Sequence, residues 1–246
     1  MSKISHGWAM ANLEGRITAH VHAWEKARER GQPLAPETYP FVTISREFGC
    51  EGGALAVRLQ EILNERCRPF FTWVAYDQEV LDEVAKALHV ARGVVETIDG
   101  HRRSEMSELF DAILNQRVDE ALVFRKMAEV VRSLAIHGHT VLVGRGSYLI
   151  TQDLKTGMHV RLEAPRDWRV HRIATDRELS MTEAEKVVHQ GERERDHYIK
   201  TFFTQDPSHK FHHDLVIDNS RFNLSQIAEI VFTALSVRFG ETLVGA

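Results

Sequence analysis

The stretch FVTISREFGCEGGALAVRL, residues 41–59, determines the expected fold class. Its first part is apolar and β-branched, and its last part has leucines and valines at helical spacing. Between them lies a short loop that contains Gly49, Gly52 and Gly53. A strand, a glycine-rich loop and a helix in this order are typical of phosphate-binding sites, because backbone N–H groups and the positive end of the helix dipole face the anion. However, the loop has no lysine, so the standard P-loop pattern G-x-x-x-x-G-K-[ST] is absent from it.

The bulk composition is that of an ordinary soluble protein. A length of 246 residues fits one large α/β domain or a domain with an insertion, and a hydrophobic content of 43% suffices for a sizeable core. The net charge of −4 gives no reason to expect a nucleic-acid partner. Cys50 and Cys67 provide no disulfide framework and suit a reducing cytoplasm. We expect no membrane helix and no signal peptide, because the chain has no run of about 18 apolar residues and no apolar N-terminal segment.

Hydrophobic periodicity predicts alternating strands and helices after an N-terminal amphipathic helix and a proline-rich linker, which together make up residues 1–38. This alternation indicates an α/β fold with a parallel sheet and right-handed crossovers, in which ligands bind at the carboxyl ends of the strands. The expected strands are 41–45, 70–75, 140–144, 158–162 and 214–218. The expected helices are 53–66, 77–89, 104–137, 166–177, 181–203 and 223–239.

Four blocks of sequence carry a resemblance. They are TISREFGCEGGALA (43–56), YDQEVLDEVAKALHV (76–90), VLVGRGSYLI (141–150), and EAPRDWRVHRI (163–173) with ERERDHYIKTFFTQDP (192–207) and HHDLVIDNSRFNLSQIAEIV (212–231). In this order they resemble the phosphate loop, the segment after the second strand, a strand that ends in Gly-Arg, and the lid region with the last strand of the cytidylate kinase-like family. This family is a branch of the P-loop nucleoside monophosphate kinases. The match covers about residues 40–235, and residues 1–38 lie outside it.

The resemblance implies a P-loop NTPase-like, three-layer α/β sandwich with a five-stranded parallel sheet, in a kinase-like domain over residues 39–240. Within this domain, residues 77–137 would form a helical substrate-side region and residues 178–208 a lid-like region. The implied activity is transfer of the ATP γ-phosphoryl group to a nucleoside monophosphate, CMP or dCMP, in the presence of Mg²⁺. The implied partners are therefore ATP and a nucleoside monophosphate.

The glycine loop is the expected phosphate-donor site, formed by Arg46, Gly49, Cys50, Glu51, Gly52 and Gly53. The position of the P-loop lysine falls on Gly52, and the position of the Mg²⁺-binding hydroxyl falls near Ala54 or Leu55. Glu51 adds a negative charge that should repel phosphate. The remaining attractions are backbone donors, the helix dipole and Arg46, and the family's usual loop also lacks the lysine. The alternative interpretation is a tight turn in which the glycines only permit close packing.

Polar residues at strand ends are the expected acceptor and base contacts. Arg145 follows the strand VLVG, and its planar guanidinium can bind an acceptor phosphate with two hydrogen bonds. In cytidylate kinases an aspartate follows the corresponding Gly-Arg, whereas Gly146 follows here. Asp77, after the second strand, could hold Mg²⁺ through water, contact the acceptor or cap a helix. For Asp218 and Asn219, a base or ribose contact is the functional interpretation and a turn is the alternative; for Arg145 the alternative is a surface arginine.

Arg193 and Arg195 are the expected catalytic residues. They lie in the helical run ERERD, and lid arginines of this superfamily stabilise the charge on the transferred phosphoryl group. Arg169 and Arg172 lie on the preceding helix and could assist. The same alternation of charges is also typical of a solvated helix face with i,i+3 and i,i+4 ion pairs.

Two classes of function remain open. The preferred one is a phosphotransferase, and the alternative is a non-catalytic nucleotide sensor or interaction protein in which Glu51 and the missing lysine weaken turnover. In the second case the N-terminal helix, with Trp8 and Trp24, could serve for docking or homodimerisation. No metal site made of side chains is expected, because the histidines within 209–213 are accompanied by neither a CxxC nor an HExxH pattern.

Overall fold

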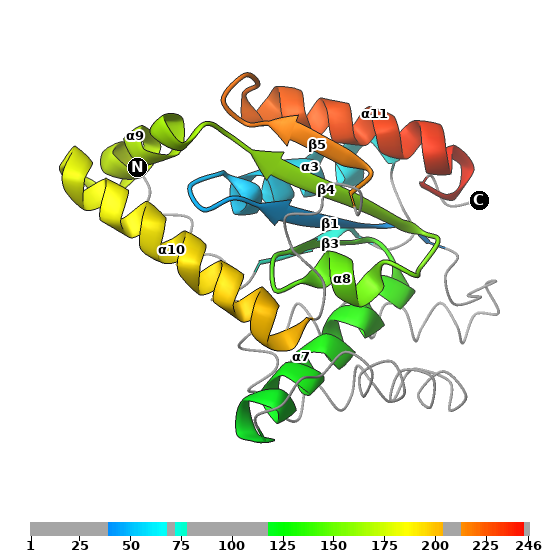
Figure 1. Ribbon diagram of the computed structural model, residues 1–246. Helices are drawn as coiled ribbons and strands as arrows, with labels where there is room; N and C mark the ends of the chain where they lie inside the picture. The colour runs from blue at the N-terminus through cyan, green and yellow to red at the C-terminus, as the bar shows by residue number, and fades with distance from the viewer. Residues whose placement is uncertain (1–38, 68–71, 78–117, 204–212, 244–246) are drawn as a thin grey trace.

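The computed structural model describes residues 39–67, 72–77, 118–203 and 213–243 (Figure 1). The predicted N-terminal helix, residues 78–89 of the predicted helix 77–89 and much of the expected substrate-side region lie outside these residues. The described part is built around a five-stranded sheet whose strands all run parallel. The strands are β1 (Phe41–Arg46), β2 (Val74–Tyr76), β3 (Thr140–Val143), β4 (Gly157–Glu163) and β5 (Leu215–Asp218).

The strand order β2-β3-β1-β4-β5 puts β1 at the centre of the sheet. Ile44 of β1 lies beside Val143 of β3, and Ser45 lies beside Arg161 of β4. After β1 the chain crosses to β2 and β3 on one side, and later to β4 and β5 on the other. The switch point of the sheet is therefore the carboxyl end of β1, where the glycine-rich loop begins and where such sheets bind ligands.

Helices cover both faces of the sheet and form a three-layer sandwich, which confirms the expected fold class (Figure 1). Val42 and Ile44 share a core with α3 and α11, whereas Phe41 belongs to the core with α7 and α8 on the opposite face. This alternation follows from the two-residue period of a strand, and the continuous apolar run of β1 is what burial on both faces requires. The helices are α3 (Gly52–Cys67), α7 (Val118–His137), α8 (Ser147–Thr151), α9 (Arg166–Arg177), α10 (Met181–Phe202) and α11 (Leu224–Leu243).

Helices α9 and α10 form a hairpin at one end of the sheet (Figure 1). Ser180 begins α10 with a reciprocal capping box to Glu183, and Glu178 ends α9 in the left-handed conformation with φ 55°. The hairpin has a small core of its own, and Phe48 from the glycine-rich loop packs against it. Within the described residues, no helix of this or any other layer is long and apolar enough to cross a membrane.

Two expectations about secondary structure need correction. Strand β2 covers Val74–Tyr76, whereas 70–75 was expected. The backbone of Trp73 is bonded to the Asn64 side chain instead of a strand, because Asn64 accepts from its N–H over 2.7 Å and donates to its carbonyl over 3.0 Å. Helix α8 (Ser147–Thr151) was not expected, because a five-residue helix is too short to show helical periodicity.

Candidate functional site

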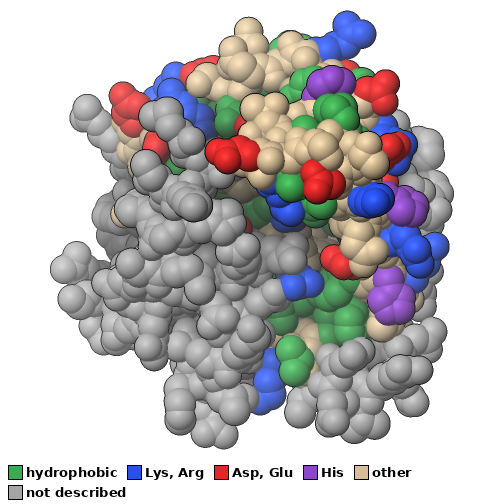
Figure 2. All heavy atoms as spheres, turned by 90° about the vertical axis from the view of Figure 1, so that its left-hand side faces the viewer, with side chains coloured by type: hydrophobic (Ala, Val, Ile, Leu, Met, Phe, Trp, Pro, Cys, Tyr) green, Lys and Arg blue, Asp and Glu red, His purple; other side chains and the backbone are tan. Residues whose placement is uncertain are grey.

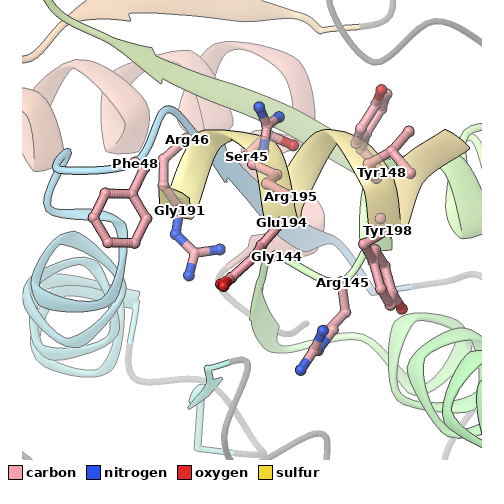
Figure 3. Close-up of a pocket in the computed structure, with 12 residues that line it drawn as sticks. Ser45, Arg46, Phe48, Gly144, Arg145, Tyr148, Gly191, Glu194, Arg195 and Tyr198 are labelled. Carbon is pink, nitrogen blue, oxygen red and sulfur yellow. The ribbon is translucent and has the colours of Figure 1, made fainter. Parts of the chain in front are cut away.

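A cavity of about 320 Å³ lies between the carboxyl ends of β1 and β3 and the helix α10 (Figure 3). It sits at the switch point of the sheet, where this topology places ligands. Its walls combine charged groups with glycines and aromatic rings. Prominent among them are Ser45, Arg46, Gly144, Arg145, Arg195 and Tyr198.

Three arginines reach this cavity from three different elements (Figure 3). Arg46 ends β1, Arg145 follows β3, and Arg195 extends from α10 beside Ser45. The pKa of Arg46 is lowered to about 10, first by burial and then by the positive charge of Arg195. Burial and the charge of Arg161 also lower the pKa of Arg195. A bound anion would relieve this repulsion between like charges.

Among the described residues, few carboxylates lie close to Arg46 and Arg195. Within the described residues, neither Arg46 nor Arg195 forms an ion pair, although Glu194 lies in the cavity wall. The negative charge of Asp77, which follows β2, raises the pKa of Arg46, whereas the positive charges of Arg195 and Arg145 lower it. Cations without a close counter-charge are costly to bury. The site is therefore arranged to receive an anion such as a phosphate.

The loop that carries Arg145 has an unusual backbone. Gly144, Arg145 and Gly146 have positive φ angles of 79°, 52° and 67°. Glycine adopts such angles freely, but they cost a larger residue about 1 kcal/mol or more. The Arg145 guanidinium also lies 4.9 Å from the centre of the Tyr198 ring, in a cation–π contact. Strained positions of this kind cluster at ligand sites, and Arg145 lies in the cavity wall.

Helix α9 and the end of β5 hold the glycine-rich loop in place. Arg172 Nη1 donates to the Gly49 carbonyl over 2.6 Å, and Arg172 Nη2 lies 3.1 Å from Glu51 Oε1 in an ion pair. The Glu51 N–H donates to Asn219 Oδ1 over 2.9 Å. Arg172 thus balances the carboxylate that was expected to repel phosphate. The first N–H groups of α3, which follow directly, have no acceptor within their own helix.

Arg169 fastens the same loop to two further elements. Its side chain is buried, and it donates through Nε to the Ala164 carbonyl at the end of β4 and through Nη1 to the Phe48 carbonyl, both over 3.0 Å. Arg169 also forms an ion pair with Glu192 of α10 and lies 3.4 Å from Glu47. With all these partners, Arg169 positions the loop and the helix α10 relative to each other.

Cys50 lies in this loop but is not an activated thiol. Burial, and next the negative charge of Glu47, raise the pKa of Cys50 to about 12. The thiol is therefore neutral near pH 7, and nucleophilic chemistry needs the thiolate. Cys50 instead packs against the core that β1 shares with α3 and α11.

Comparison with known proteins identifies the family. The sequence profile of the cytidylate kinase-like family matches residues 41–221. The chain belongs to the cytidylate kinase-like family. Membership in a kinase-like family supports a phosphotransferase activity. A search of curated proteins gave no match.

Solved structures with low sequence identity to this chain share similarity with it in fold and carry no information on its activity. An uncharacterized protein from Eubacterium ventriosum is 18% identical with a TM-score of 0.62, over 80% of this chain and 98% of that chain. Shikimate kinase from Acinetobacter baumannii, in complex with shikimate, is 14% identical with a TM-score of 0.44, over 82% of this chain and 95% of that chain.

This member of the cytidylate kinase-like family brings Arg195, but not Arg193, to the cavity. Arg193 is exposed and borders a separate shallow hollow with other residues of α10. Two steps along a helix turn a side chain by about 200°, so the two arginines face opposite sides. Figure 2 shows acidic, basic and histidine side chains interspersed over the face that α9 and α10 present. Such mixing is typical of a solvated surface.

The expected base-side residues have partners within the protein. Asp218 accepts from the Ser220 N–H over 2.9 Å and from its hydroxyl over 2.6 Å, and these bonds lower the pKa of Asp218. Asn219 is buried and accepts from the N–H of Glu51. This geometry is that of a turn that supports the glycine-rich loop, and a base or ribose contact stays a prediction.

Some residues of the cavity wall were not predicted. Tyr198 lies three residues after Arg195, so a helical wheel centred on Arg195 would have placed both on one face. Ser45 and Gly191 also line the cavity. Nothing in the local sequence distinguishes them, because their roles depend on the approach of α10 to the end of β1.

Proposed function

We propose that the protein transfers the γ-phosphoryl group of ATP to a nucleoside monophosphate, with CMP and dCMP as the first candidates. The observation that carries this proposal is the convergence of Arg46, Arg145 and Arg195 on one cavity beside the glycine-rich loop. Phosphoryl transfer has a transition state with negative charge on donor, acceptor and transferred group, and its catalysis rests on positioning and electrostatic stabilisation. Arg46 and Arg195, which form no ion pair within the described residues, suit this task as stabilising cations.

The proposed roles follow from the elements that carry the residues. The glycine-rich loop, fixed by Arg172 and Asn219, binds the donor phosphates through its N–H groups and the α3 dipole. Arg145 binds the acceptor phosphate, because it extends from the separate loop after β3. Arg195 stabilises the transferred phosphoryl group, because α10 carries it over the end of β1 beside Ser45.

Mg²⁺ is expected to arrive with ATP, and the residues fit a metal held largely by the nucleotide. In the ranges that the structure describes, no group of three or more His, Cys, Asp or Glu side chains could hold a metal ion. Ala54 and Leu55, where the Mg²⁺-binding hydroxyl was expected, also provide no hydroxyl ligand. Since Mg²⁺ commonly takes one or two carboxylates together with phosphate oxygens and water, Asp77 is the candidate protein ligand. Bound Mg²⁺ would neutralise charge on the phosphate oxygens.

A non-catalytic nucleotide sensor is the second candidate. The observation in its favour is the loop itself, in which Gly52 stands where a P-loop has its lysine and no serine or threonine follows at positions 53–55. Isothermal titration with Mg·ATP and then CMP, followed by ADP production over a panel of nucleoside monophosphates, separates the two functions. Turnover supports the kinase, binding without turnover supports the sensor, and the absence of both rejects both.

Substitutions of the arginines test the roles. Arg145→Ala should raise KM for the acceptor much more than KM for ATP; an equal rise for both would contradict the acceptor role. Arg195→Ala should lower kcat by about 10²–10³-fold, the usual effect of removing one stabilising donor. Arg193→Ala is the matched comparison on the same helix, and its effect should be much smaller. Similar losses in the two variants would show that the orientation of α10 does not decide the role.

A further inference from the structure

Arg46 fills the space in front of Gly52, the first residue of α3. A Cβ atom on Gly52 would lie 2.8 Å from Arg46 Cδ and 3.4 Å from its Cγ and Nε. Real Cβ atoms essentially never approach other atoms closer than 3.0 Å. Gly52 has no positive φ angle, so the backbone itself would accept a larger residue. Arg46 and any side chain at position 52 therefore compete for one space.

The far end of Arg46 reaches the loop after β3. A Cβ atom on Gly144 would lie less than 3.0 Å from Arg46 Nη1. The guanidinium consequently lies between the start of α3, where donor phosphates are expected, and the loop that carries Arg145. In phosphoryl transfer the migrating group passes between the donor and acceptor phosphates, which is the space that Arg46 spans.

Position 52 is also where a standard P-loop has its lysine. Arg46 Cδ stands close to the place of the Cβ atom that such a lysine would have. From Cδ to a terminal guanidinium nitrogen the chain is one bond shorter than from a lysine Cβ to its ammonium nitrogen. The two cations would therefore reach the same region, although Arg46 enters from the strand before the loop and the lysine from the helix after it.

We propose that Arg46 is the catalytic cation of the donor site and takes the place of the P-loop lysine. This inference rests on the proposed phosphotransferase function and deepens it. Arg46 is protonated at neutral pH, since its pKa is about 10, and it forms no ion pair within the described part of the chain. Its planar guanidinium can donate to two phosphate oxygens at once, whereas an ammonium acts as a point charge.

Removal of the charge is the first test. Arg46→Met keeps most of the aliphatic volume of Arg46 and loses the guanidinium. We expect kcat to fall by about 10²–10³-fold and Tm to stay the same or rise, because a half-buried cation without an ion pair is lost. A purely structural role would instead lower Tm and activity together.

A relocated lysine is the sharper test. Gly52→Lys alone should lower Tm and activity, because the new Cβ collides with Arg46. In Arg46→Ala/Gly52→Lys the space is free, and the ammonium should restore kcat at least about tenfold over Arg46→Ala, or about 1.4 kcal/mol of transition-state stabilisation. The matched control is Arg46→Ala/Gly53→Lys, with the same charge one residue later, where no atom lies within 4 Å of the added Cβ. We expect no restoration there.

The possible outcomes separate the inference from the function on which it rests. If the wild-type protein transfers phosphoryl groups and Arg46→Met does so equally well, the role of Arg46 is refuted and the proposed function stands. Equal activity of the two double variants would likewise refute it. A wild-type protein that neither binds Mg·ATP nor turns over rejects the proposed function and the role of Arg46 with it.

Discussion

Gly191→Ala tests whether Phe48 fastens the glycine-rich loop to α10. A Cβ atom on the buried Gly191 would lie within 2.5 Å of three ring carbons of Phe48. For its nearest carbon to reach an ordinary contact of 3.4 Å, the ring must retreat by at least 1.2 Å. Phe48 packs against the core of the α9–α10 hairpin, and its neighbour Gly49 belongs to the loop. The substitution should therefore both destabilise the hairpin and displace the loop.

Two opposing terms set the magnitude. Replacing a helical glycine by alanine favours the helix by up to about 1 kcal/mol, whereas overpacking a filled site costs about 1–3 kcal/mol. Gly240→Ala in α11 isolates the first term, because nothing lies within 4 Å of a Cβ there. The two alanine variants should thus differ by about 1–3 kcal/mol in the free energy of unfolding. For a chain of this size that corresponds to a Tm about 2–12 °C lower for Gly191→Ala than for Gly240→Ala.

The assay combines thermal unfolding with titration of Mg·ATP. Gly191→Ala should melt below Gly240→Ala and bind Mg·ATP more weakly than the wild type, while Gly240→Ala should bind as the wild type does. If Gly191→Ala raised Tm by the same amount as Gly240→Ala, the packing of Phe48 against α10 would be refuted. A lower Tm with unchanged affinity would refute the link between the hairpin and the phosphate loop.

Two further predictions concern charge. His159 is 7% exposed, lies 2.8 Å from Thr43 Oγ1 through Nδ1, and burial lowers its pKa from 6.5 to about 4. The unfolded chain therefore protonates this imidazole more readily than the folded protein does. This difference contributes about 3 kcal/mol to the free energy of unfolding above pH 6.5, and the contribution should be lost as the pH falls towards 4. In unfolding measurements at several pH values, His159→Gln should flatten this dependence, whereas substitution of an exposed histidine, His189→Gln, should leave it unchanged. Glu51→Gln removes a negative charge from the loop, while Arg172 keeps its ion pair with Asp176, so Mg·ATP binding should strengthen by a few-fold at low salt. Weaker binding in the titration would mean that the Glu51–Arg172 pair is needed to order the loop.

The sequence predicted the central sheet well because its signals are local. The apolar β-branched runs of β1, β3, β4 and β5 begin and end within about one residue of the expected ranges. The predicted α9 range of 166–177 is confirmed at both ends, since Pro165 precedes it and a left-handed residue follows it. Strand β2 was placed too early because a side chain of α3 bonds the backbone of Trp73, a long-range contact that no local pattern reports.

The site was predictable in its residue types but not in its geometry. The run ERERD predicted Arg193 and Arg195 as a pair, because an alternation of charges does not show which side of the helix faces the sheet. Docking of α10 on β1 brings only Arg195 to the cavity. Glu51 was expected to repel phosphate because the sequence does not show its ion-pair partner. That partner, Arg172, lies over a hundred residues later in the chain.

The missing lysine illustrates why one motif position is weak evidence of lost function. Gly52 leaves the space that Arg46 fills, and Gly144 receives the far end of the same side chain. These three positions depend on one another, because a lysine at position 52 would collide with Arg46 and push its side chain out of this space. A change from one arrangement to the other needs at least two substitutions together. If Arg46 supplies the cation of the donor site, the lysine can be absent from position 52 only while Gly52 stays small enough to leave room for the arginine.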